Sequence, residues 1–281
     1  MLNAAGVELE EHPISQAVDP GHVRVALVMA GICRTDLAVA HGALEVRRPR
    51  ILGHEAAGVV VQADGSTGAH LVGKPVAIDP RVDGFLGVDA DGAFATSIDL
   101  PQDNVIELSL NVAWTRAAYL EPTAAALGPI EALRKAECAA IVGRNRIAAL
   151  TKMLADAEAI DVTWVRDPDA LPARTFDTVV ESDPRFVKAS IGALCDGGTL
   201  IAKSRPSADV ALPLAEIVTR NLCVKGAAYG NFRAAAAKLA DTSIPFERLF
   251  GATFDLAAFD RAFATASKSE DHKTFIRLSY A

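Results

Sequence analysis

A thiol, an imidazole and a carboxylate stand in two short segments that could together bind a metal ion. Cys33 lies in Gly31-Ile-Cys-Arg-Thr-Asp36, and His54 and Glu55 lie in Leu52-Gly-His-Glu-Ala-Ala-Gly58. Zinc prefers ligands of these types. Cys33 and His54 are too far apart for a zinc-finger knuckle, but their spacing suits ligands that a fold brings together around an open coordination position. The two segments therefore predict a catalytic metal site.

In this order the two segments resemble those of the zinc-containing medium-chain dehydrogenase/reductase family, which includes the alcohol and polyol dehydrogenases. Members carry a Gly-Ile-Cys-x-Thr/Ser-Asp segment and then a Gly-His-Glu-x-x-Gly segment. The likeness continues to the C-terminus and covers nearly the whole chain. It implies a catalytic zinc ion, a nicotinamide cofactor, and hydride transfer between an alcohol and a carbonyl. It also implies a small-molecule substrate and a homo-oligomer, with a dimer expected.

The resemblance assigns metal ligands residue by residue. Cys33 would bind as a thiolate and His54 through a neutral ring nitrogen. Two glutamates are alternative candidates for the third metal ligand. Glu55 adjoins His54, and the family sometimes uses that glutamate; Glu121, in Tyr119-Leu-Glu-Pro122, matches the Glu-Pro position of the polyol dehydrogenase-like branch. Both glutamates could bind the metal in alternation, directly or through water. Alternatively, Glu121 could be an acid at a helix N-terminus, where the helix dipole favours negative charge.

Two neighbours of Cys33 are expected to take part in catalysis together with Glu55. Thr35 matches the family position whose hydroxyl takes the substrate proton, although a local turn role is the alternative. Asp36 is expected to accept the far N–H of the zinc-bound histidine, which fixes the tautomer of the ring. The family often has a histidine two residues after this aspartate, where this chain has Ala38.

A second segment, Gly143-Arg-Asn-Arg-Ile-Ala148, stands where a dinucleotide-binding fold has Gly-x-Gly-x-x-Gly. Gly143 is retained, and Ala148 is an accepted small residue at the third position. Asn145 replaces the central glycine; it tolerates positive φ, but its side chain stands where the diphosphate approaches. Arg144 and Arg146 add positive charge beside the expected helix N-terminus, which itself attracts phosphate.

Further cofactor contacts are expected at three places. Arg166 and Asp167 follow the second strand of this region, where an acid favours the free ribose of NAD and an arginine the phosphate of NADP. The choice stays open, with NADP favoured over NAD. Ser204 ends a strand on the nicotinamide side. Lys273 matches a family position whose basic residue meets the diphosphate.

The fold class expected from the sequence is α/β, with two domains. Residues 1–116 and 250–281 are expected to form a β-rich barrel, because short strands there alternate with glycine and proline. The matching family element is the GroES-like catalytic domain. The expected strands run over residues 22–30, 56–62 and 92–101, and a further strand is expected within 73–80, between a turn and a stop.

Residues 117–249 alternate between strands and helices, which predicts a Rossmann-type parallel sheet for nucleotide binding. Few residues separate Asp167 from Phe176, whereas a crossover to a parallel strand needs about a dozen. A helix and a strand of the usual fold are therefore expected to be missing. The expected strands run over 137–142, 161–165, 178–181 and 199–202, and the expected helices over 117–135, 144–155 and 184–194.

Composition restricts the class of protein. The chain has 281 residues, a formal net charge of −7, 51% hydrophobic residues and 22% charged residues. The negative charge argues against nucleic acid and anionic membranes as partners. The 4 cysteines are scattered, without a Cys-x-x-Cys pair, which argues against a disulfide framework and a second, four-cysteine zinc site and favours the cytoplasm.

The sequence is compatible with three functions. The leading hypothesis is a zinc-dependent alcohol dehydrogenase or ketoreductase linked to NADP or NAD. The second is a zinc-site enzyme of the same fold that has lost dinucleotide redox, lyase- or hydrolase-like, and it is favoured by Asn145 and by the missing crossover. The third is a scaffold without activity, which the intact cysteine and histidine segments argue against.

Overall fold

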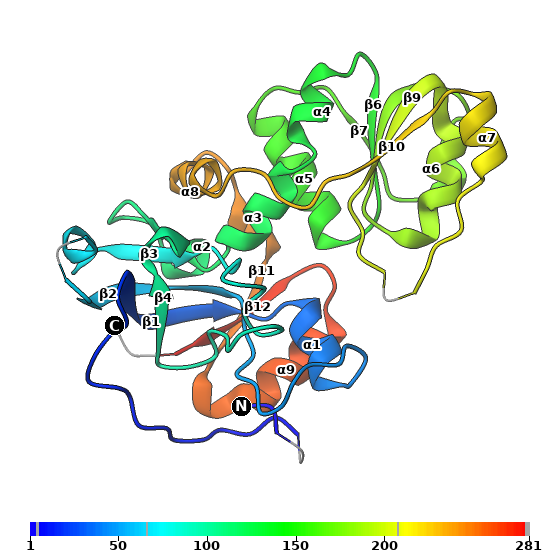
Figure 1. Cartoon of the computed structure of the whole chain (residues 1–281). Coiled ribbons are helices and arrows are strands. Elements are labelled where there is room, and N and C mark those ends of the chain that lie inside the picture. Colours follow the sequence, from blue (N-terminus) through cyan, green and yellow to red (C-terminus); the bar gives the residue numbers. More distant parts are fainter. Residues whose placement is uncertain (4–5, 66, 207, 279–281) are drawn as a thin grey trace. The chain divides into compact units, whose positions relative to one another are not determined.

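The computed structural model describes residues 1–3, 6–65, 67–206 and 208–278, which form two compact units (Figure 1). The first unit comprises Met1–Glu121, Ala235–Thr242 and Phe246–Ala281, and the second comprises Pro122–Ala234 and Ser243–Pro245. Helices α3 (Leu120–Leu127) and α8 (Phe232–Ala240) each begin in one unit and end in the other. None of the described helices has the length and hydropathy needed to cross a membrane.

The first unit is built on a mixed sheet whose strands run in the order β11-β12-β1-β2-β3-β5, with β4 also paired to β1. All these pairs are antiparallel except β11 with β12. Its strands are β1 (His22–Gly31), β2 (Glu55–Ala63), β3 (Pro75–Ile78), β4 (Ser97–Pro101), β5 (Val105–Glu107), β11 (Phe250–Asp255) and β12 (Lys273–Arg277); its helices are α1 (Arg34–Ala40), α2 (Trp114–Ala117) and α9 (Phe259–Lys268).

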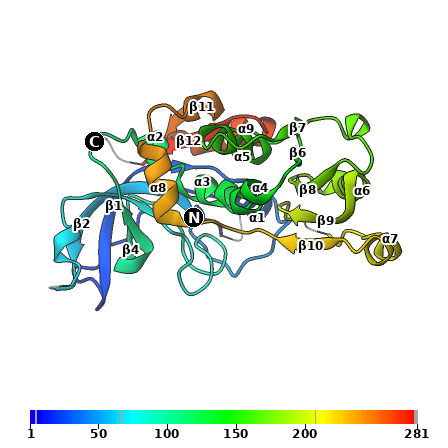
Figure 2. The same cartoon turned by 90° about the horizontal axis from the view of Figure 1, so that it is seen from above.

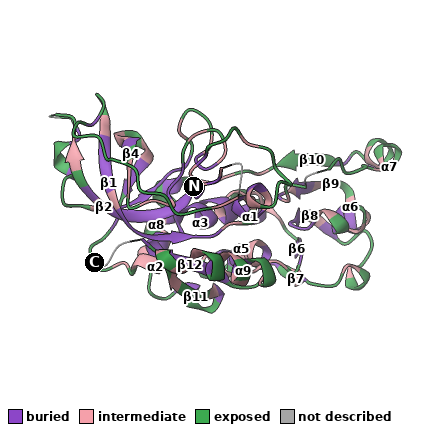
Figure 3. Cartoon of the chain, turned by 90° about the horizontal axis from the view of Figure 1, so that it is seen from below, coloured by how far each residue is buried: buried purple, intermediate pink, exposed green. Residues whose placement is uncertain are grey.

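The core of this unit follows β1 and β2, where buried residues dominate (Figure 3). Valine and leucine side chains from these strands pack into one apolar cluster together with Ala262 and Ala266 of α9. The C-terminal strand β12 pairs with the end of β1, Gly31 opposite Phe275. The strand β12 thus belongs to the sheet of the first unit.

The second unit is a parallel sheet with the strand order β10-β9-β8-β6-β7 in the described residues. Helices α4 and α5 lie on one side of it and α6 on the other (Figures 1 and 2). Its strands are β6 (Ala139–Val142), β7 (Thr163–Val165), β8 (Phe176–Glu181), β9 (Leu194–Ala202) and β10 (Cys223–Gly226); its helices are α4 (Ile130–Lys135), α5 (Arg146–Ala157), α6 (Val187–Ala193) and α7 (Leu214–Thr219).

The predicted loss of a crossover is confirmed. Between β7 and β8 the chain forms only a short 3-10 helix, Pro168–Ala170. Strand β7 lies at the edge of the sheet beside β6. The unit is therefore a reduced Rossmann-type sheet, so the fold class predicted from the sequence is correct.

Two predicted elements differ from the structure. The helix expected over 117–135 is divided into α3 and α4 at Gly128 and Pro129, because proline provides no amide to continue a helix. The strand expected over 92–101 is restricted to β4, Ser97–Pro101.

Candidate functional site

The two metal-ligand segments meet because β1 and β2 are antiparallel neighbours. Gly31, at the end of β1, is the partner of Glu55, at the start of β2. Cys33 follows one strand and His54 precedes the other, so the strand ladder places both beside Glu55. Single ligand atoms of Cys33, His54 and Glu55 all lie within 4.8 Å of one another. His54 and Glu55 are buried, and Cys33 is half-buried.

Asp36 links the two segments. Its Oδ2 accepts a hydrogen bond from the Cys33 amide at 2.8 Å, and its Oδ1 accepts one from the Gly53 amide at 3.1 Å. The same Oδ1 lies 3.3 Å from His54 Nδ1. A carboxylate in this position restrains the orientation of the imidazole ring and makes it a better ligand. The ring of Phe85 packs against His54 on another side, at a centroid distance of 5.0 Å.

The charge around His54 favours a cation. Burial by itself lowers the pKa of His54, but the nearby Asp36 carboxylate and Cys33 thiolate outweigh burial and hold the pKa well above its usual range. The imidazole thus stands in a field that stabilises positive charge. A half-buried thiol beside a buried imidazole and a buried carboxylate in such a field fits the divalent cation that the resemblance implies.

Glu55 forms a buried ion pair with Lys273. Lys273 Nζ lies 2.6 Å from Oε1 and 2.5 Å from Oε2 of Glu55, and it donates to the Ile32 carbonyl at 3.1 Å. Both charged side chains are 1% exposed. Gly31 leaves room for them, since a Cβ there would lie 2.6 Å from Glu55 Oε2. Lys273 had been expected at the diphosphate, whereas the structure directs its ammonium group to Glu55.

Thr35 and Glu121, which were also predicted at the metal centre, lie differently relative to the donor cluster. Thr35 Oγ1 lies 3.9 Å from Cys33 Sγ, so the hydroxyl adjoins the thiol. Glu121 is buried in the first turn of α3. It does not belong to the donor cluster found in the described residues, which consists of Cys33, His54 and Glu55.

The turn after β6 in the second unit requires glycine at its first position. Gly143 has a φ of +146°, and a Cβ at this position would lie 2.2 Å from Ser182 Oγ. Asn145 does not use positive φ: with φ of −77° it is the residue before α5, and its side chain caps that helix. Arg146 is the first residue of the helix, and Ala148 is fully buried.

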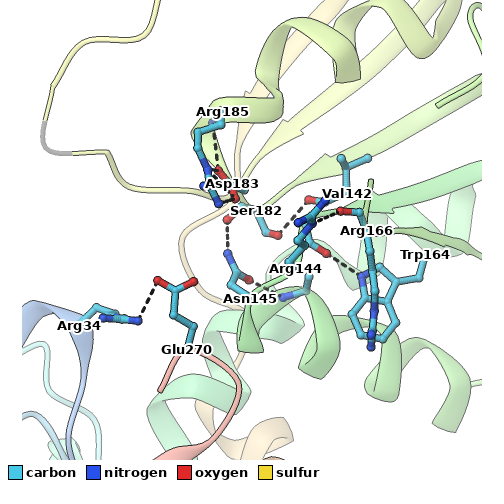
Figure 4. A network of polar contacts seen from close by, with 12 residues as sticks. Arg34, Val142, Arg144, Asn145, Trp164, Arg166, Ser182, Asp183, Arg185 and Glu270 are labelled. Atoms are coloured by element: carbon cyan, nitrogen blue, oxygen red, sulfur yellow. Dashed lines mark hydrogen bonds and ion pairs between the residues drawn. The ribbon is translucent and has the colours of Figure 1, made fainter. Parts of the chain in front are cut away.

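The arginines near this turn lie at the ends of neighbouring strands (Figure 4). The Arg166 guanidinium stacks on the Trp164 ring at 4.0 Å from its centroid, and Arg144 Nε donates to the Arg166 carbonyl at 2.7 Å. Arg185 binds Asp183 through two nitrogens, at 2.9 and 2.6 Å. This bond, with a smaller effect from Arg144, lowers the pKa of Asp183.

Ser204 follows β9, as expected, and binds a buried acid. Its Oγ donates to Glu181 Oε2 at 2.9 Å. Burial raises the pKa of Glu181, and the hydrogen bond from Ser204 offsets this only in part. Lys203, beside it, donates to the carbonyl oxygens of Ala227 and Ala228.

Sequence reasoning missed two features of these sites. The Glu55–Lys273 pair joins residues 218 positions apart, and no local pattern signals it. The stacking of Arg166 on Trp164 could have been predicted, because residues i and i+2 of a strand share a face. Trp164 precedes Arg166 by two positions, in and just after β7.

Comparison with known proteins agrees with this architecture. Residues 19–109 match the alcohol dehydrogenase GroES-like domain. D-xylulose reductase A of Aspergillus oryzae is 23% identical over 96% of this chain and 93% of its own length. Sorbitol dehydrogenase 2 of Saccharomyces cerevisiae is 26% identical over 57% of this chain and 52% of its own.

Solved structures share the fold. A zinc-binding dehydrogenase from Sinorhizobium meliloti bound to NADP superposes with a TM-score of 0.80 at 23% identity, covering 92% of each chain. Galactitol-1-phosphate dehydrogenase from Escherichia coli gives 0.83 at 18% identity, covering 98% of each. The matched domain, the relatives and the shared fold agree with the cysteine and histidine segments, and together they support the predicted resemblance to the medium-chain alcohol and polyol dehydrogenases.

Proposed function

We propose that this chain is a zinc-dependent oxidoreductase that interconverts an alcohol and a carbonyl with NADP(H) or NAD(H). The observation that carries the proposal is the donor cluster of Cys33, His54 and Glu55 beside the Thr35 hydroxyl. The dehydrogenases to which the chain is similar act on polyols and sugars by name. A small polyol or its ketone is therefore the proposed substrate class.

The two domains proposed from the sequence divide this work. Residues 1–116 and 250–281 form the proposed catalytic domain, and residues 117–249 the proposed nucleotide-binding domain. The two compact units of the structure change over after Glu121, within α8, and at Ser243–Pro245.

Within the catalytic domain, Cys33 and His54 would hold the zinc ion, and Glu55 is the third ligand that the geometry favours. Glu121 remains the predicted alternative. Zinc would supply the polarisation of the substrate oxygen. Asp36 orients the His54 ring, and Lys273 holds Glu55 in place. Thr35 Oγ1 would accept the substrate hydroxyl proton during oxidation while releasing its own hydroxyl proton towards solvent, and both transfers would reverse during reduction.

The proposal is tested with metal-replete protein, a panel of polyols and ketoses, and each cofactor. We expect absorbance at 340 nm to change with one or more of these substrates and to stop changing after the metal is removed by a chelator. Activity that survives complete metal removal would refute zinc dependence.

Replacement of Thr35 by valine is expected to lower turnover on the order of a hundredfold, the effect of losing a general acid–base group. Valine keeps the shape of the side chain and removes the proton path, so zinc content and cofactor affinity should change little. Steady-state kinetics and elemental analysis measure the two effects. Thr253→Val, at an exposed threonine of β11, is the matched control. An unchanged rate in Thr35→Val would leave Thr35 with only a turn role.

Replacement of Arg166 by alanine is expected to weaken NADP(H) binding by roughly 1.5–3 kcal/mol, the range for hydrogen bonds to charged groups, and to leave NAD(H) nearly unchanged. The exposed guanidinium is supported on Trp164. Asp167, which could oppose a phosphate there, accepts a hydrogen bond from the Asp169 amide instead. Titration of both cofactors measures the effect, with the exposed Arg233→Ala as control. Equal losses for both cofactors would show that Arg166 only shapes its loop.

The second candidate is a zinc-site lyase or hydrolase of this fold that no longer binds a dinucleotide. The capping role of Asn145 and the missing crossover favour it. Protein-enhanced nicotinamide fluorescence separates the candidates, since the wild-type protein gives no signal with either reduced cofactor if the second candidate is correct.

A homo-oligomer, with a dimer expected, is part of the proposal. Strand β10 lies at the edge of its sheet and its four residues are exposed. Apolar side chains near it are also exposed, among them Val224 of β10 and Val218 of α7. An open strand edge with exposed apolar residues favours pairing with a second copy. The cytoplasm, predicted from the scattered cysteines, is the proposed location.

A further inference from the structure

The side chain of Asn145 lies between the start of α5 and the end of β8 (Figure 4). Asn145 Oδ1 accepts a hydrogen bond from the Ala148 amide, in the first turn of α5, at 3.0 Å. The amides of this first turn have no partner within the helix, and they are the groups that bind phosphate at a helix N-terminus. The protein thus satisfies one of them with its own side chain.

The side-chain nitrogen of Asn145 links the turn to the end of β8 by a hydrogen bond. Asn145 Nδ2 donates to the Ser182 carbonyl at 2.5 Å. Ser182 in turn donates through its amide and its hydroxyl to the Val142 carbonyl, each at 3.0 Å. Asn145 therefore bridges the helix start and the end of the neighbouring strand, so a phosphate can take the Ala148 amide only after two hydrogen bonds open.

The backbone of the turn is held as well, so it offers little room to move away. The Gly143 amide donates to the Val165 carbonyl at 3.1 Å, and the Gly143 carbonyl accepts from Trp164 Nε1 at 2.9 Å. A phosphate would have to displace the Asn145 side chain rather than shift the turn. Two opened hydrogen bonds lower a binding constant on the order of 10- to 100-fold.

Positive charge is available farther along the same edge of the sheet. Arg185 is engaged by Asp183, whereas the Arg166 guanidinium rests on Trp164 and has no carboxylate partner among the described residues. A second phosphate on the adenosine end of a ligand could reach Arg166 without displacing Asn145.

We propose that Asn145 determines ligand specificity: it closes the helix N-terminus to the diphosphate of a dinucleotide, so that affinity depends on a phosphate at the adenosine 2′ position. This inference rests on the proposed dinucleotide function and narrows it to NADP(H).

The test compares wild type with Asn145→Gly and Asn145→Asp by isothermal calorimetry, without turnover. The probes are adenosine diphosphate, which has only the diphosphate, adenosine 2′-monophosphate, which has only the 2′-phosphate, and NADP. Glycine frees the Ala148 amide and is tolerated as a cap; aspartate keeps the cap and adds a negative charge. Circular dichroism verifies that both variants are folded.

We expect Asn145→Gly to bind adenosine diphosphate and NADP on the order of tenfold more tightly than wild type. Asn145→Asp should bind both more weakly, and adenosine 2′-monophosphate should bind all three proteins alike. If NADP binds wild type and Asn145→Gly equally well, or the glycine variant less well, the role of Asn145 is refuted and the dinucleotide function stands. If no probe binds any of the three folded proteins, both are refuted.

Discussion

Replacement of Cys33 by serine is expected to leave the metal centre without zinc. Wild-type protein expressed with ample metal should carry one zinc ion per chain, and the variant close to none. A neutral hydroxyl is a much poorer zinc ligand than a thiolate. Loss of an outer-shell partner alone typically lowers metal affinity about 10–100-fold, so loss of a direct ligand should exceed the upper end of that range. Elemental analysis and competition with a chromophoric chelator measure content and affinity.

The matched control for this variant is Cys138→Ser, at an exposed cysteine outside the donor cluster. It should retain its zinc and its activity. The expected stoichiometry follows from the single group of three donors among the described residues. Two zinc ions per chain, a wild type that binds none, or a Cys33→Ser variant that retains its metal would each contradict the assignment.

Replacement of Lys273 by methionine is expected to destabilise the zinc-free protein by about 3–5 kcal/mol, the usual loss when one partner of a buried ion pair is removed. Methionine fills most of the space of the lysine stem. It leaves Glu55, which is 1% exposed, without the ammonium group that now contacts both of its oxygens. Urea unfolding measures the loss, followed by Trp114, which lies in the same compact unit, in a Trp164→Phe background.

Two further variants make this measurement specific. Lys74→Met removes an ion pair with Glu107 in which both side chains are 47% exposed, and it should cost no more than about 1 kcal/mol. Combining Lys273→Met with Glu55→Gln removes the unpaired charge, so most of the lost stability should return. A loss below about 1 kcal/mol in Lys273→Met would show that Glu55 finds another partner.

The sequence determined the features that depend on short stretches of chain. The cysteine and histidine segments could be recognised because their residues lie within a few positions of a strand end, where strand pairing then brings them together. The reduced sheet could be predicted from the few residues between Asp167 and Phe176, since the length of a crossover is a purely local quantity. The same holds for Asp36, which reaches the Cys33 amide within one turn of helix.

Only the tertiary structure decided which partner each polar group takes when the partners are far apart in sequence. Lys273 was expected at a phosphate. It meets Glu55 because the pairing of β12 with β1 places the two side chains over Gly31. Asn145 stands in place of a glycine and is a residue type that tolerates positive φ. It adopts negative φ because the end of β8 presents the Ser182 carbonyl to its amide while the start of α5 presents a free N–H. Buried polar groups must find partners, and strand register, which the sequence does not state directly, determines which partners are in reach.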